Sequence, residues 1–216
     1  MNLTRLVLGN LMTNCYILKN KEQKLAAVID PAADAPRILA ELEGYQAAFI
    51  LLTHGHFDHI LALDELREAT GMPVYVHRDD ADFLTDARKN YSLPATGKNR
   101  TFRPAEHLLE GGERIAFGNE ILRVLHTPGH TMGSVCYRIG STIFSGDTLF
   151  ENDMGRTDLY GGNQALLMKS LKTLCSIPGN ADIFPGHGMA TTLEAERENN
   201  IFLRYLDEPY GTHFIQ

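Results

Sequence analysis

The sequence Thr-His-Gly-His-Phe-Asp-His at positions 53–59 constrains this chain more than any other stretch, because it places three imidazoles and one carboxylate within six residues. The apolar run before it has the composition of a strand buried on both faces. Side chains two positions apart in an extended segment point to the same side, so His54 and His56 converge, whereas Asp58 and His59 open a predicted helix. Buried without partners, these groups would each cost kilocalories of desolvation, and imidazole with carboxylate suits zinc, iron or manganese. The stretch therefore predicts two sets of metal ligands; the alternative is a solvated loop that is rich in histidine.

Bulk composition limits the size of the fold and the kinds of partner. With 216 residues, 44% of them hydrophobic, the chain can form one large core, and we expect a single domain over residues 1–216. The net charge of −7 argues against nucleic-acid or acidic-membrane partners, which need a basic surface. No run approaches the roughly 18 to 20 apolar residues that span a bilayer, and no long apolar signal segment follows Met1. Three scattered cysteines fit a reducing cytoplasm better than a disulfide framework.

Alternating and helical patterns predict an α/β protein. The first thirty residues alternate apolar and polar side chains, as antiparallel strands do. Strand and helix patterns then follow one another, with glycine or proline at several boundaries. The predicted strands are residues 3–8, 15–18, 25–29, 47–52, 74–76, 114–117, 120–125, 134–139, 141–144 and 181–184. The predicted helices are residues 36–43, 60–69, 78–84, 163–175 and a last one that begins at the capping-box sequence 191–194 and runs to about Leu206.

Residues 85–107 form the least periodic segment, and we predict a surface loop there. A loop of this length inside a compact domain is more often functional or mobile than idle, so a lid or a substrate contact is one interpretation. A tolerated insertion is the other.

Three later strands repeat one arrangement, in which an apolar strand ends in glycine beside one possible metal ligand. The strands are 121–125, 141–144 and 181–184, and the ligands that follow them are His130, Asp147 and His187. Glycine lets the backbone turn sharply or approach a ligand closely, and strand ends are rigid mounts for converging side chains. One structural zinc takes about four ligands, so a larger set is better explained by two metals that share a carboxylate. The complete set of donors is His54, His56, Asp58, His59, His130, Asp147 and His187, with Asp147 as the expected bridge.

These motifs resemble the metallo-β-lactamase superfamily, motif by motif and in the same order, over almost the whole chain. They are His54-x-His56-x-Asp58-His59, Pro128-Gly129-His130-Thr131, Ser145-Gly146-Asp147-Thr148 and Pro185-Gly186-His187-Gly188. The resemblance implies a four-layer αββα sandwich, with two mixed sheets face to face and helices outside. It also implies a first metal on His54, His56 and His130, and a second on Asp58, His59 and His187, bridged by Asp147.

Within that superfamily, the absence of a cysteine ligand is similar to the glyoxalase II branch and unlike the zinc β-lactamases. Residues 146–150 followed by Gly155-Arg156 also resemble this branch, where a basic residue contacts glutathione. The resemblance implies a thioesterase for S-lactoylglutathione or related glutathione thioesters, with Arg156 on a substrate carboxylate; an arginine in such a loop is otherwise often only solvated.

The expected chemistry is attack of a metal-bridging hydroxide on the thioester. Zinc is the preferred metal, with iron or manganese as alternatives. A thiolate whose conjugate acid has a pKa of about 8.5 leaves without a strong general acid. Asp58 is the expected catalytic residue, because it would both bind metal and orient the nucleophile.

Two departures from the glyoxalase II pattern affect the choice of substrate. Only residues 188–216 follow the last histidine ligand, so we expect the helical domain that supplies glutathione contacts to be missing, and Met189 stands where the family has tyrosine. The chain thus resembles the short, single-domain glyoxalase II-like proteins.

Other activities stay open. Residues 155–158 are also similar to the persulfide dioxygenases, which would use one iron on His54, His130 and Asp147. A non-catalytic metal protein, a lactonase and a nuclease are further hypotheses. Two other histidines, His77 and His126, end predicted strands, and we expect them to be hydrogen-bond partners rather than ligands.

Overall fold

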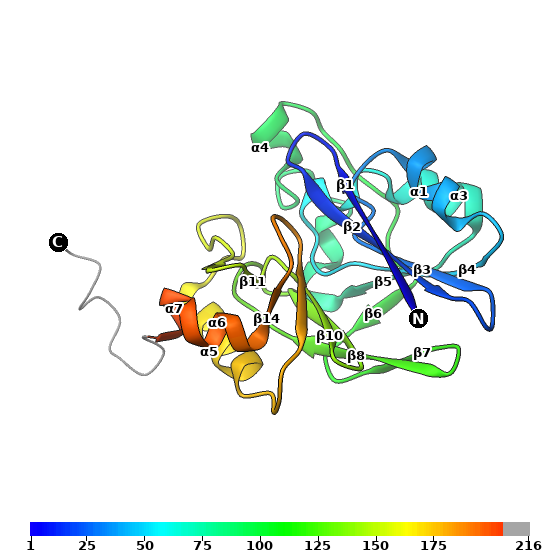
Figure 1. Cartoon of the computed structure of the whole chain (residues 1–216). Coiled ribbons are helices and arrows are strands. Elements are labelled where there is room, and N and C mark those ends of the chain that lie inside the picture. Colours follow the sequence, from blue (N-terminus) through cyan, green and yellow to red (C-terminus); the bar gives the residue numbers. More distant parts are fainter. Residues whose placement is uncertain (205–216) are drawn as a thin grey trace.

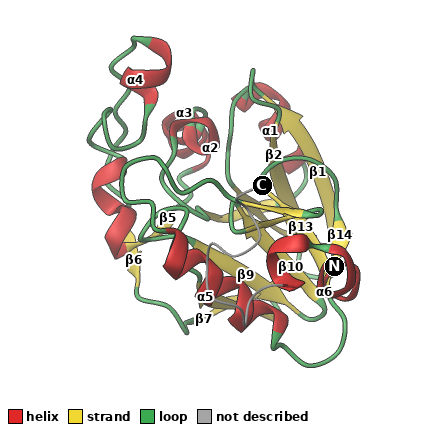
Figure 2. Ribbon diagram, turned by 90° about the vertical axis from the view of Figure 1, so that its left-hand side faces the viewer, coloured by secondary structure: helices red, strands yellow, loops and turns green. Residues whose placement is uncertain are grey.

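The chain folds into four layers, with two β-sheets face to face and helices on both outer surfaces (Figure 1, Figure 2). The computed structural model describes residues 1–204. The first sheet has the strand order β1-β2-β3-β4-β5-β6 and the second β14-β13-β10-β9-β8-β7, while β11 and β12 pair separately. Both large sheets are mixed, because β3 to β6 run parallel, β10 pairs parallel with β13, and the other pairs are antiparallel. The predicted αββα sandwich is therefore confirmed.

The elements have the following bounds. The strands of the first sheet are β1 Asn2–Leu8, β2 Thr13–Asn20, β3 Leu25–Ile29, β4 Gln46–Leu51, β5 Val74–His77 and β6 His107–Leu109. Those of the second sheet are β7 Arg114–Phe117, β8 Glu120–His126, β9 Val135–Ile139, β10 Thr142–Gly146, β13 Asp182–Pro185 and β14 Thr191–Thr192, and the short pair is β11 Leu149–Phe150 with β12 Asp153–Met154. The helices are α1 Ala35–Leu42, α2 Phe57–Ile60, α3 Leu63–Thr70, the 3-10 helix η1 Arg78–Phe83, α4 Ser92–Thr96, α5 Gln164–Cys175, α6 Leu193–Asn199 and α7 Ile201–Arg204.

Three apolar clusters fill the three spaces between the four layers, and strand periodicity distributes side chains among them. In β2, Cys15 and Ile17 face α1 and α3, whereas Tyr16 and Leu18 face the second sheet. The third cluster packs α5, α6 and α7 against the outer face of the second sheet, through residues such as Ile143. Because successive strand side chains point to opposite faces, an apolar residue at every position is what a strand in a middle layer requires.

Most predicted elements lie within a residue or two of the observed ones, and the helices differ most. The helix predicted over 60–69 is two helices, α2 and α3, separated by a short turn. The last helix starts one residue later than the capping box implied, because the Thr192 hydroxyl accepts a hydrogen bond from the Ala195 amide and caps it. The predicted helix is also interrupted at Asn200, whose extended backbone separates α6 from α7, and its expected end at Leu206 lies outside the described residues.

The segment 85–107 is more ordered than the predicted loop. It contains the short helix α4, and its Asn90 side chain is fully buried. The Asn90 amide donates to the carbonyls of Phe83 and Arg100, and the Asn90 carbonyl accepts from the Phe57 amide. These bonds close the segment on itself and attach it to the start of α2. The predicted surface loop is therefore partly structured, because a single buried asparagine supplies order that periodicity does not reveal.

The parallel strands deliver their carboxyl ends to one edge of the sandwich. Strands β3, β4 and β5 lie side by side in the same direction, and the motif at 53–59 leaves the end of β4. Within residues 1–204, no helix has the length and apolar character needed to cross a membrane.

Candidate metal centre

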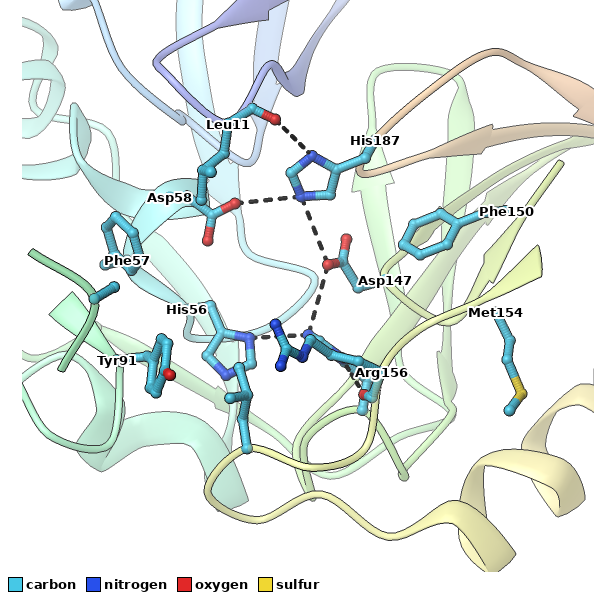
Figure 3. A pocket seen from close by; sticks show the side chains of 13 residues that line it. Leu11, His56, Phe57, Asp58, Tyr91, Asp147, Phe150, Met154, Arg156 and His187 are labelled. Carbon is cyan, nitrogen blue, oxygen red and sulfur yellow. Dashed lines mark hydrogen bonds and ion pairs between the residues drawn. The ribbon is translucent and has the colours of Figure 1, made fainter.

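All seven predicted donors converge at this edge of the sandwich. His54, His56, Asp58 and His59 follow β4 or lie in α2, and the other three come from the ends of β8, β10 and β13 in the second sheet. Figure 3 shows His56, Asp58, Asp147 and His187 around one space, with dashed contacts from His187 to Asp58 and to Asp147. His130 lies within 3.6 Å of Asp147 and 2.9 Å of His56. The centre therefore lies between the two sheets, and each sheet supplies part of it.

The first group consists of His54, His56 and His130, whose ligand atoms lie within 4.8 Å of one another. His130 Nε2 is 3.3 Å from His54 Nε2 and 2.9 Å from His56 Nδ1. All three side chains are buried, at most 4% exposed. This group is a nitrogen-only pocket.

The second group consists of Asp58, His59 and His187 and is more open. Asp58 Oδ2 lies 3.5 Å from His59 Nε2 and 3.2 Å from His187 Nε2. His59 is fully buried, whereas 29% of the His187 side chain is exposed. One oxygen donor and one exposed histidine therefore distinguish this group from the first.

Asp147 lies between the two groups. Its Oδ1 is 3.4 Å from His59 Nε2, and its Oδ2 is 3.6 Å from the Nε2 atoms of both His130 and His187. The carboxylate thus faces both groups, as a bridging ligand must. Close backbone approach makes this possible: a Cβ atom on Gly186 would lie 2.2 Å from Asp147 Oδ1, so only glycine fits there.

Outer hydrogen bonds set the tautomers of four histidines so that each Nε2 lone pair faces the centre. His130 Nδ1 donates to the Arg156 carbonyl, and His187 Nδ1 donates to the Leu11 carbonyl. His59 Nδ1 donates to Asp30. His54 Nδ1 donates to the Thr53 hydroxyl, whose own hydrogen goes to Asp30. Such outer partners orient metal-binding imidazoles and increase their basicity.

The donor set fits a pair of divalent cations. The Nε2 atoms of His54 and His130 lie 3.3 Å apart, and both carry lone pairs because their protons are on Nδ1. His59 Nε2 and Asp147 Oδ1 are buried and have no hydrogen-bond partner. A buried acceptor without a donor costs about 1–3 kcal/mol, which a cation between these atoms would offset. His56 Nε2, on the outer side of its ring, is also buried without a partner.

Protonation differs between the two groups. Burial, with repulsion from neighbouring imidazoles, holds the pKa of His54 well below its usual value and lowers the pKa of His56 to about 3. Burial also lowers the pKa of His130, so the first group is neutral, which is the form that binds metal. For His59, burial acts in the same direction, but Asp58, Asp147 and Asp30 outweigh it and raise the pKa well above the usual value. A proton on His59 Nε2 and a divalent cation thus compete for the same position between His59, Asp58 and Asp147.

Two buried carboxylates that sequence reasoning missed support the centre. Asp30, at the end of β3, accepts from the Thr53 amide at 2.7 Å, the Thr53 hydroxyl at 2.6 Å and His59 Nδ1 at 2.9 Å. The signal was available, because Asp30 ends an apolar strand as the later ligands do.

The second missed carboxylate, Asp80 in η1, fastens the two backbone segments of the first group together. Its oxygens accept from the amides of Gly55 and Gly133 at 2.9 and 2.8 Å, and from the Thr131 hydroxyl at 2.7 Å. Gly55 lies between two of the histidines and Thr131 follows the third. Burial raises the pKa of Asp80 to about 6, although these three donors oppose the rise. Nothing in its local sequence indicates this role.

Arg156 lies on the rim of a cavity of about 560 Å³ that opens onto the centre. Leu11, Tyr91 and Phe150 line the same cavity (Figure 3). The Arg156 guanidinium donates to both oxygens of Asp158, each at 2.7 Å. The predicted substrate-binding side chain is thus near the centre, with its charge already paired.

A separate group of possible ligands, His77, Asp79 and His126, lacks the geometry to chelate a cation. The two imidazole rings stack with their centroids 4.0 Å apart and only 14° between their planes. Lone pairs lie in the ring planes, so those of two parallel rings cannot meet at one cation. His77 Nδ1 accepts from the Asp79 amide, and His126 Nε2 donates to the Met132 carbonyl. The prediction that both histidines are hydrogen-bond partners is confirmed.

The fold and the centre together define a class: αββα sandwiches with paired His/Asp clusters suited to a binuclear metal site. The chain belongs to the metallo-beta-lactamase superfamily, whose family model matches residues 8–187. The same class includes metallo-hydrolases.

Two curated relatives and two solved structures extend this result. The chain is 40% identical over 204 residues to the probable metallo-hydrolase YqgX of Bacillus subtilis, covering 92% of this chain and 96% of the relative. It is 31% identical over 213 residues to hydroxyacylglutathione hydrolase GloC of Haemophilus influenzae, covering 94% and 98%. BLEG-1 B3 metallo-beta-lactamase superposes with a TM-score of 0.89 at 39% identity, covering 94% of this chain and 99% of that one. TTHA1623 in a di-iron-bound form gives 0.82 at 38% identity, covering 93% and 100%.

Proposed function

We propose that this metallo-hydrolase is a glyoxalase II-like thioesterase, which hydrolyses S-lactoylglutathione or a related glutathione thioester to a hydroxyacid and glutathione. The observation that carries the proposal is the seven-donor centre without cysteine, which opens into a cavity of about 560 Å³. The likeness to a hydroxyacylglutathione hydrolase over 94% of the chain supports the substrate class.

The residues divide the chemistry among them. One cation would be held by His54, His56 and His130. The other would be held by Asp58, His59 and His187, and Asp147 would bind both cations. When bound, two divalent cations supply a hydroxide nucleophile near neutral pH and a Lewis acid for the oxyanion that forms at the carbonyl carbon. The zinc, iron and manganese alternatives stay open, because all three suit histidine and aspartate donors.

We propose that Asp58 orients the nucleophile. Its Oδ2 accepts from the Thr13 hydroxyl at 3.0 Å and faces His187, and its side chain lines the cavity. Although burial alone would raise the pKa of Asp58, His59 and His187 lower it to about 2, so it is ionised and can accept a hydrogen bond from the nucleophile. The departing thiolate needs no strong acid, because its conjugate acid has a pKa of about 8.5.

The persulfide dioxygenase alternative would use one iron on His54, His130 and Asp147. These residues do approach one another, with His130 Nε2 3.3 Å from His54 Nε2 and 3.6 Å from Asp147 Oδ2. A single ion there would leave the second group to a proton on His59, between Asp58 and Asp147, whereas two ions would use all seven donors. This difference favours the binuclear hydrolase.

The test combines elemental analysis with two assays on one preparation. We expect close to two metal equivalents per chain, hydrolysis of S-lactoylglutathione, and no oxygen uptake with glutathione persulfide. Oxygen uptake without thioester hydrolysis would replace the hydrolase with the dioxygenase. Bound metal with neither activity would leave a non-catalytic metal protein.

A further inference from the structure

A second cavity adjoins the metal centre on the side away from Arg156. It has a volume of about 540 Å³ and shares Leu11, Phe57, Asp58 and Ala95 with the cavity over the centre. Both volumes lie in the range of small-molecule sites, roughly 300 to 1,000 Å³. Asp58, a ligand of the second group, forms part of both walls. The two cavities therefore share part of one wall, beside the second group of ligands.

Two cations, Lys98 and Arg100, which follow α4, also line this cavity. Both side chains are exposed, and among residues 1–204 neither forms an ion pair. Asp58 is the sole described carboxylate among the lining residues, and its oxygens are directed to Thr13 and the metal centre. The net charge of the chain is −7, so two unpaired cations beside the centre give this cavity a positive local field within an acidic protein.

The contrast with Arg156 makes these cations the better anion site. Arg156 already donates to both oxygens of Asp158, so a substrate carboxylate would have to displace that partner. Lys98 and Arg100 have no carboxylate to displace. The backbone that holds them is fixed, because the Arg100 carbonyl accepts from the buried side chains of Asn90 and Ser92 at 3.0 and 3.3 Å.

We propose that Lys98 and Arg100 form an anion subsite that binds a carboxylate of the thiol part of the substrate, so that the enzyme selects thioesters with an anionic leaving thiol. This inference rests on the proposed thioesterase function. It adds a selectivity for anionic thiols, which thioester hydrolysis by itself does not require. The segment 85–107 then acts as a substrate-binding element that brings positive charge to an acidic protein. The competing explanation is that both residues are ordinary solvated surface cations, which predicts no dependence of binding on substrate charge.

A binding experiment tests the subsite without turnover. The metal-loaded protein is titrated with S-methylglutathione and with its dimethyl ester, which lacks both negative charges. We expect the ester to bind about tenfold more weakly, and K98A/R100A to bind both compounds with the weaker affinity. The alanine variant keeps the Arg100 carbonyl and its two hydrogen bonds, so the fold is retained. R88A is the matched control, because Arg88 is an exposed cation of the same segment that lines neither cavity; it should bind as the wild type does.

Kinetics give a second readout. For S-lactoylglutathione, K98A/R100A should increase KM about tenfold with kcat nearly unchanged, whereas a thioester of the uncharged thiol N-acetylcysteamine should be hydrolysed equally by both proteins. Added salt should weaken binding of S-methylglutathione to the wild type more than to the variant.

The outcomes separate the two claims. Three results would overturn the subsite. The wild type could bind S-methylglutathione and its ester equally, it could bind neither, or K98A/R100A could bind S-methylglutathione with wild-type affinity. Charge-dependent binding that K98A/R100A removes, without hydrolysis of any thioester, would keep the subsite and refute the thioesterase.

Discussion

The two halves of the metal centre differ in composition, exposure and charge. The first half, His54, His56 and His130, is buried, uncharged and made of nitrogen donors. The second half contains Asp58 and the partly exposed His187, beside a fully buried His59. The first half is therefore a buried, neutral nitrogen pocket, whereas the second half includes a carboxylate and an imidazole that is partly exposed to solvent; both halves line the cavity.

The supporting carboxylates show the same division. Asp80 binds only backbone amides and a hydroxyl around the first half, so it fixes where the two ligand segments lie. Asp30 binds an imidazole of the second half directly. Asp30 also reaches His54 of the first half, but only through Thr53, so the imidazole that a supporting carboxylate binds directly belongs to the second half. The comparison teaches that a symmetric-looking set of ligands can be held by two different mechanisms.

The strongest test removes the residue that joins the halves. Asp147→Ala should release metal from both halves and lower kcat by on the order of 10³-fold, because the shared ligand and its charge are lost. Elemental analysis and thioester hydrolysis on the same sample measure this. If metal binding disappears while every tested turnover is unchanged, the centre is not catalytic.

Single ligand removals in each half should have unequal effects. His187→Ala should lose one metal equivalent and keep the other at nearly wild-type affinity, because the first half lies apart and is buried. His130→Ala should weaken the retained metal as well, since removing this buried ring leaves a cavity beside the bridging carboxylate, whereas the partly exposed His187 leaves only solvent-accessible space. Activity should fall by about 10²-fold or more in both. Chelator competition with cobalt-loaded protein separates the two; identical release curves would contradict the division into halves.

The outer carboxylates should act on different halves. Asp30→Asn keeps a residue that tolerates the positive φ of 50° at this position but loses acceptor capacity for His59, so second-half affinity should fall about 10- to 100-fold. Asp80→Asn should lower first-half affinity by a similar or smaller factor. Metal affinity from chelator competition is the readout, with thermal unfolding of the metal-free proteins as the control for simple loss of stability. Equal effects of both variants on both metals would refute the two mechanisms.

Lowering the pH should release metal from the two halves at different pH values, and this is the smallest of the expected effects. The raised pKa values of His59 and His187 mean that protons compete with metal in the second half while the pH is still near neutral. The lowered pKa values in the first half mean that protons compete there only at much lower pH. Titration from pH 8 to pH 5 should therefore release the second-half metal first. Release of both metals in one step would show that the halves are not independent.

Much of this molecule can be predicted from its sequence. The seven donors follow apolar strands, and strand ends converge at one edge of a sheet, so the position of the centre follows from local pattern. The αββα class follows from the order of the motifs. Element boundaries were accurate where glycine or proline ended an alternating run, and poorer for the helix over 60–69, which divides into α2 and α3.

Other features depend on contacts between segments that are distant in sequence. The order in segment 85–107 comes from the buried Asn90, and the pairing of Arg156 with Asp158 depends on side-chain geometry that spacing does not specify. Asp80 lies 25 residues from Gly55 and 53 from Gly133 along the chain. No local pattern indicates such a residue.

The sequence by itself determined which side chains can bind metal and on which strand ends they are mounted, because donor chemistry and strand periodicity are local properties. Only the tertiary structure decided how the donors divide into a buried neutral half and an open acidic half. Burial and the distances between charges fix protonation, and both arise when the two sheets pack together. The same packing leaves Lys98 and Arg100 unpaired on the wall of a cavity beside the centre, where their charge is available to a substrate.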